Sequence, residues 1–89
     1  MLPLSRWPFW RITLRVAAQL KPHVLVGRNI LRLRLRAKLT QERLAEEIGI
    51  DLRSLQRIEA GSWNMTVDYL DRFRAVLHCS WGAFFRGMD

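Results

Sequence analysis

The stretch from Thr40 to Gly61, TQERLAEEIGIDLRSLQRIEAG, constrains the fold more than any other part of the chain. Thr40 and Asp51 can each cap the start of a helix by accepting a backbone N–H, and Gly49 can end the first helix in a left-handed conformation. The apolar residues between them recur at the three- and four-residue spacing of a buried helix face; they are Leu44, Ala45, Ile48, Leu55 and Ile58. We therefore predict two short helices that cross over a tight turn, with the small Ala45 side chain letting the backbones approach.

Helical periodicity continues on both sides of this stretch. A helix is predicted over residues 26–38, with an inner face of Ile30, Leu33 and Ala37. Thr66 can cap a further helix, whose expected buried stripe is Val67, Leu70, Phe73 and Leu77. Ser80 can cap a last short turn. The expected fold class is all-α: a compact five-helix domain over residues 24–89, with an N-terminal extension over residues 1–23.

Length and charge limit what such a domain can do. With 89 residues the chain holds one domain and one modest core. The net charge of +7 is uneven, because residues 1–41 hold nine Lys and Arg and no acid, whereas residues 42–89 hold six bases and eight acids. This asymmetry favours a polyanionic partner, either nucleic acid or an acidic membrane surface.

The extension over residues 1–23 is basic and rich in aromatic residues. Apolar and polar residues alternate from Trp10 to Val16, which fits a strand, but together with Ala17, Ala18 and Leu20 the same residues fit an amphipathic helix. Three roles stay open for it: an arm that contacts phosphates, a dimerisation segment, or a poorly ordered extension upstream of the domain.

Several function classes lack support in the sequence. Cys79 is a single cysteine, which fits a small buried hydrophobic residue in a reducing, cytoplasmic compartment. His23 and His78 lack metal-ligand spacing, so we expect no metal and no cofactor. No nucleophile and base stand in paired positions, so we expect no enzyme. No apolar run is long enough to span a membrane.

From about Gly27 to Phe85 the chain resembles the phage-repressor-type helix-turn-helix family, also called the Cro/cI or XRE family. The residues that carry the resemblance are Ile30, Leu33, Arg34, Thr40, Gln41, Leu44, Ala45, Ile48, Gly49, Leu55, Ile58, Glu59, Gly61, Leu70, Leu77 and Phe85. The resemblance implies a lambda-repressor-like fold that binds double-stranded DNA. It also implies that Arg34 and Glu59 form an internal salt bridge and that Gln41 contacts a DNA phosphate.

The helix at about residues 52–59 is the expected DNA reader. Leu52, Arg53, Gln56 and Arg57 lie where relatives present base-reading side chains. Their chemistry fits independently, because Arg pairs with guanine, Gln with adenine and Leu with the thymine methyl group. The alternative for Arg53 and Arg57 is that they are solvated or touch only phosphate.

Further phosphate contacts are expected from Asn64 and, on the preceding helix, from Arg32 and Arg36. Asn64 is followed by Met65, whereas relatives often carry Pro at that position. Trp63 either stacks on the DNA backbone or covers the core.

A surplus of aromatic residues near the C-terminus indicates a second surface. Trp81, Phe84 and Phe85 exceed what one short turn needs, so they form a possible dimer interface; the alternative is core filling by the two Phe residues. A homodimer would place two recognition helices about 34 Å apart on a palindromic operator.

The sequence thus predicts a cytoplasmic, nucleoid-associated transcriptional regulator that binds specific double-stranded DNA and acts as a repressor. The alternative is an antitoxin or another protein-interaction module, in which the N-terminal segment binds a partner protein such as a toxin. A membrane-surface role for that segment ranks third, since its prolines interrupt any long amphipathic helix.

Overall fold

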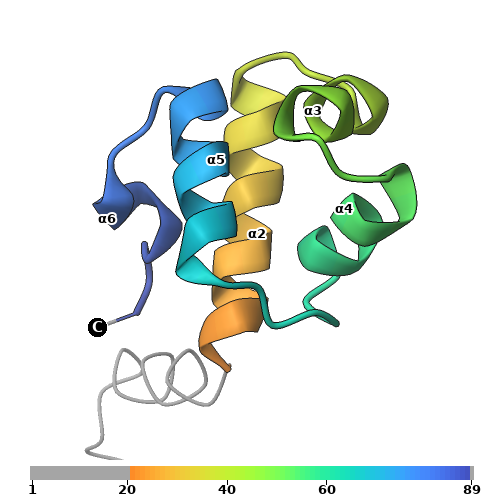
Figure 1. The fold of residues 1–89 in the computed structure, drawn as a ribbon. Coiled ribbons are helices and arrows are strands. Elements are labelled where there is room, and N and C mark those ends of the chain that lie inside the picture. The colour runs from red at the N-terminus through yellow and green to blue at the C-terminus, as the bar shows by residue number, and fades with distance from the viewer. Residues whose placement is uncertain (1–20, 89) are drawn as a thin grey trace, which may run out of the picture.

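The computed structural model describes residues 21–88, and this part of the chain consists of helices joined by short loops (Figure 1). The helices are α2 (Pro22–Arg36), α3 (Gln41–Ile48), α4 (Leu52–Glu59), α5 (Val67–Leu77) and α6 (Trp81–Phe84). Within residues 21–88 there is no strand. The predicted all-α class with five helices is confirmed for this part.

Helix α2 begins earlier and ends earlier than predicted. Pro22 occupies the first turn, where its missing N–H is not needed, so this proline starts the helix and does not break it. The chain leaves the helix at Ala37, and Lys38 takes a left-handed φ of 59°. Ala37 is consequently exposed, and its predicted place on the inner face is wrong.

The caps around α3 and α4 follow the sequence prediction. The Thr40 hydroxyl accepts the Arg43 N–H at 3.1 Å, and the Asp51 carboxylate accepts the Ser54 N–H at 3.3 Å. Gly49 ends α3 with a φ of 85°, a conformation that costs glycine little because it has no Cβ. These local interactions set the two helix boundaries within the Thr40–Gly61 stretch.

Helix α5 is capped by the Thr66 hydroxyl, which accepts the Tyr69 N–H at 3.4 Å. Leu70, Phe73 and Leu77 form its buried stripe, as predicted. Val67 is 68% exposed, so its predicted burial is wrong. Val67 and Asp68 at the start of α5 face solvent, and the packed face begins at Leu70.

One core joins all the helices. Its fully buried side chains come from every element except the loops and are Ile30, Leu44, Leu55, Ile58, Phe73 and Phe84. Helix α2 is central, because it contacts α4, α5 and α6, while α3 contacts α4 and α5. In Figure 1, α3 and α4 lie on one side of α2 and α6 lies on the other.

Two side chains of α2 hold α6 in place. The buried Asn29 amide donates to the Phe84 carbonyl at 2.6 Å and to the Arg86 carbonyl at 3.0 Å. Arg32 donates to the Ala83 carbonyl at 3.3 Å. The short last helix is therefore tied to α2 by polar contacts as well as by the buried Phe84 ring.

On the opposite side, α2 and α4 approach each other at Gly27. A Cβ atom built on Gly27 would lie 2.0 Å from the Ile58 carbonyl oxygen, so only glycine permits this backbone contact. None of the helices in residues 21–88 is long and apolar enough to cross a membrane.

Candidate nucleic-acid interface

Helix α4 presents one polar face to solvent and buries the other. Leu55 and Ile58 are fully buried, which fixes the rotation of the helix about its axis. Arg53, Gln56 and Arg57 are consequently exposed, and Leu52 is partly exposed. The four predicted base-reading residues thus share one face.

The start of α4 carries a fixed negative charge. The Ser54 hydroxyl donates to the Asp51 carboxylate at 2.5 Å, and this hydrogen bond lowers the pKa of Asp51 below its ordinary value of 3.8. The hydrogen bond favours the ionised carboxylate, which Asp51 carries at neutral pH. Its charge complements the positive end of the α4 dipole.

The end of α4 is anchored by a buried ion pair to α2. Arg34 Nε donates to Glu59 Oε2 at 2.7 Å, and Arg34 Nη2 donates to Glu59 Oε1 at 3.2 Å. Only 10% of the Arg34 side chain and 4% of the Glu59 side chain are exposed. Arg34 Nη1 also donates to the Leu39 carbonyl at 2.9 Å. The salt bridge implied by the resemblance is confirmed.

Gln41 links this buried pair to the exposed face of α4. Its Nε2 donates to Glu59 Oε1 at 2.8 Å, and its Oε1 accepts from Gln56 Nε2 at 3.5 Å. Because a side-chain amide has two N–H groups, one of them stays free for an external acceptor. The structure therefore brings the predicted phosphate contact Gln41 together with the predicted base reader Gln56.

Arg32 and Arg36 do not lie on this face. Each is two residues, or about 200° of helix rotation, from Arg34, which points toward α4. Arg32 is half-buried against α6, where it donates to the Ala83 carbonyl, and Arg36 lines the same side of α2. The structure thus places both residues on the α6 side of α2, away from the exposed face of α4, and their expected phosphate contacts stay a prediction.

The loop between α4 and α5 contributes an exposed Asn64 and a half-buried Trp63. The Trp63 ring packs against the core and meets the Tyr69 ring edge-on, with centroids 5.5 Å apart. This contact supports the interpretation that Trp63 covers the core. Asn64 remains on the surface, on the connection that follows α4.

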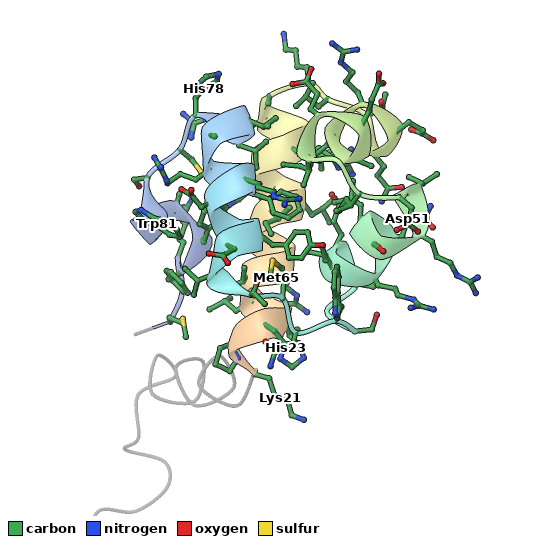
Figure 2. The ribbon with its side chains drawn as sticks, in the orientation of Figure 1. Lys21, His23, Asp51, Met65, His78 and Trp81 are labelled. Atoms are coloured by element: carbon green, nitrogen blue, oxygen red, sulfur yellow. The ribbon has the colours of Figure 1, made fainter. Side chains whose placement is uncertain are left out.

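The predicted dimer residues divide between core and surface. Phe84 is fully buried, so it fills the core and cannot meet a second chain in this conformation. Trp81 is 41% exposed and Phe85 is 39% exposed. The Arg74 guanidinium lies over the Trp81 ring at 5.3 Å. In Figure 2, Trp81 and His78 lie on the α6 side of the molecule and Asp51 lies on the opposite side.

Two residues that position the site were not singled out from the sequence. Gly27 lets α2 reach the α4 backbone, and Asn29 holds α6. Both residues could have been noticed in the sequence, because glycine and asparagine are unfavourable in the interior of a helix.

The possible roles of the N-terminal segment, including partner binding by an antitoxin, fall on residues 1–20, which lie outside the described part.

Comparison with known proteins agrees with this geometry. A family model described as helix-turn-helix matches residues 30–84. The chain belongs to the XRE-type helix-turn-helix family. It is a DNA-binding transcriptional regulator, and DNA is its partner.

Two solved structures are similar to the chain, and both are single-site variants of the restriction-modification controller protein C.Esp1396I. One is 28% identical with a TM-score of 0.67, covering 79% of this chain and 93% of that chain. The other is 30% identical with a TM-score of 0.66, covering 75% of this chain and 85% of that chain. No curated protein matches the sequence.

Proposed function

We propose that α4 enters the major groove of double-stranded DNA and reads the base sequence with Leu52, Arg53, Gln56 and Arg57. One observation carries this proposal: α4 buries Leu55 and Ile58 fully and leaves long donor side chains on the opposite face. Within residues 21–88, Arg53 and Arg57 make no side-chain hydrogen bond or ion pair, so both guanidinium groups are free to bind DNA.

The dimensions agree with groove binding. A helix with its side chains is about 10–12 Å across, and the major groove of B-DNA is about 12 Å wide. Arginine can donate two hydrogen bonds to guanine O6 and N7, and glutamine can pair with adenine. Leu52 is partly exposed at the first turn, which suits contact with a thymine methyl group.

Phosphate contacts are proposed for Gln41 and Asn64, at the start of α3 and in the loop after α4. The hydrogen bond between Gln41 and Gln56 couples the two kinds of contact. A phosphate held by the free Gln41 N–H would set the position of the Gln56 amide relative to the bases. This coupling would give the complex a fixed register along the groove.

We further propose that the protein binds a palindromic operator as a homodimer. Trp81 at the start of α6 and Phe85 directly after it are exposed aromatic side chains, and aromatic residues are enriched at protein interfaces. Two-fold symmetry would place the recognition helices about 34 Å apart. A binding site without a two-fold repeat would exclude this part of the proposal.

Repression is the proposed outcome, because occupying a promoter needs no additional surface. The two similar structures belong to a protein named as a restriction-modification controller, which makes control of restriction-modification genes a specific candidate for this chain. Measuring transcription from the promoter upstream of its own gene, with and without the protein, would decide between repression and activation.

The test of the recognition face starts with selection of bound sequences from a random duplex pool, followed by affinity measurements on the selected site and its single-base variants. Arg53→Ala and Arg57→Ala should each reduce discrimination at one base position by about 1–3 kcal/mol. Arg36→Ala is the matched control, since Arg36 lies away from α4, and it should leave base preference unchanged. If the double variant of Arg53 and Arg57 keeps the wild-type preference, the assigned face is wrong.

A further inference from the structure

A cleft lies between α2 and α6, on the side of α2 that faces away from α4. Its volume is about 740 Å³, within the range of about 300–1,000 Å³ that small-molecule sites occupy. Arg32 and Arg36 line it from α2, and Arg86 lines it from the segment after α6. His78, which marks this side of the molecule in Figure 2, also belongs to the lining.

The positive charge in the cleft is not neutralised within residues 21–88. None of the three arginines forms an ion pair within these residues. The ion pairs found there join Arg34 to Glu59, Arg43 to Glu46 and Glu47, and Arg74 to Asp71. The described lining contains no acidic residue. Burial raises the pKa of the lining Cys79 thiol, so it adds no negative charge at neutral pH.

The arginines of the cleft also retain unused donors. Arg32 donates to the Ala83 carbonyl through Nη2, while its Nε is buried without a partner. Arg36 and Arg86 are exposed and make no side-chain hydrogen bond within the described residues. Guanidinium groups bind phosphate oxygens in pairs of parallel hydrogen bonds, and a concave site of one charge concentrates counter-ions.

We propose that this cleft binds a small phosphorylated anion through Arg32, Arg36 and Arg86. The anion would bridge α2 and the chain after α6 and would offset the mutual repulsion of the three guanidinium groups. A hollow of limited volume favours a small ligand over an extended acidic peptide. The proposal is independent of DNA reading, because α2 separates the cleft from the exposed face of α4.

Inorganic pyrophosphate is the probe for this site, titrated at constant ionic strength into the full chain. NMR should show saturable shifts of the amides of Ser80, Gly82 and Gly87, which line the cleft. Shifts that are confined instead to the amides of Arg53, Gln56 and Arg57 would mean that the probe occupies the DNA face, and the proposal would be overturned.

Substitutions then assign the contacts. Arg36→Gln and Arg86→Gln should each weaken pyrophosphate binding about tenfold, as expected for the loss of a charge-assisted hydrogen bond. Arg28→Gln is the matched control, because Arg28 is an exposed arginine of α2 outside the cleft lining, and it should change binding less than twofold. If all three substitutions weaken pyrophosphate binding equally, the binding is non-specific charge attraction and the proposed site is refuted.

A hexaglutamate peptide provides the comparison with a protein-like anion. Weaker binding of this peptide than of pyrophosphate supports the proposal, and tighter binding overturns it in favour of an acidic protein partner. Both arginine variants should still bind the selected DNA site, so that failure of the anion site and failure of the DNA-binding proposal produce different results.

Discussion

Replacing Arg34 with Met should destabilise the fold strongly, because it leaves the Glu59 carboxylate buried without its cation. In the native structure Glu59 accepts two hydrogen bonds from Arg34 and one from Gln41, and its side chain is only 4% exposed. After the substitution Gln41 is the remaining side-chain donor. Breaking one partner of a buried pair costs about 3–5 kcal/mol.

That cost is large relative to the total stability of a small domain, which is about 5–15 kcal/mol. Removing the second charge as well should restore much of it. In the double variant Arg34→Met with Glu59→Leu, no unpaired charge is buried, and apolar side chains fill a similar volume. Such replacements are often neutral or stabilising. The double variant should therefore be more stable than Arg34→Met alone.

Urea unfolding followed by circular dichroism measures these differences, with Glu47→Gln as the control. Glu47 pairs with Arg43 at 2.9 Å on the surface, where both side chains are at least 38% exposed. Loss of such an exposed pair should cost about 0–1 kcal/mol. If Arg34→Met costs no more than the control, or if the double variant is less stable than the single one, the buried pair does not anchor α4 as we argue.

Three further predictions concern the elements around the site. Gly27→Ala should destabilise the protein by about 1–3 kcal/mol in urea unfolding, since a Cβ there meets the α4 backbone; Gly82→Ala, where a Cβ meets nothing closer than 3.9 Å, is the control and should not destabilise. Asn29→Leu should lower the free energy of unfolding by about 1–3 kcal/mol in the same assay, because the Phe84 and Arg86 carbonyl groups lose their donor. An unchanged free energy of unfolding would contradict the role of Asn29 in holding α6. The pKa of Asp51 is lowered on folding, so its ionised form stabilises the native state above the unfolded value of 3.8 and this contribution is lost as the pH falls through the lower folded pKa. The stability difference between wild type and Asp51→Asn should therefore shrink on going from pH 7 to pH 3, and a difference that stays constant would exclude the carboxylate as its source.

Much of the proposed DNA-binding face could be predicted from the sequence because its geometry depends on local rules. The cap residues Thr40 and Asp51 set where α3 and α4 begin, and the apolar spacing sets which side of each helix is buried. Once Leu55 and Ile58 are buried, the 3.6-residue repeat leaves Arg53 and Arg57 outside. The Arg34 and Glu59 pair followed from the family resemblance and not from any local rule.

Which side of α2 meets which helix could not be derived in this way. Arg32, Arg34 and Arg36 alternate with leucines in the same short run, and nothing within that run indicates that one faces α4 while the others face α6. The partners lie 25 residues away for Arg34 and 51 residues away for Arg32. The choice depends on how distant helices pack.

By itself the sequence determined where most helices begin and end and which of their faces are apolar, because hydrogen bonds and side-chain spacing within a few residues decide both. Only the tertiary structure decided that Phe84 belongs to the core, that Val67 does not, and that the excess positive charge on α2 faces a cleft beside α6. Those outcomes depend on contacts between residues far apart in the chain, because the packing of one helix against another decides which side chains are buried.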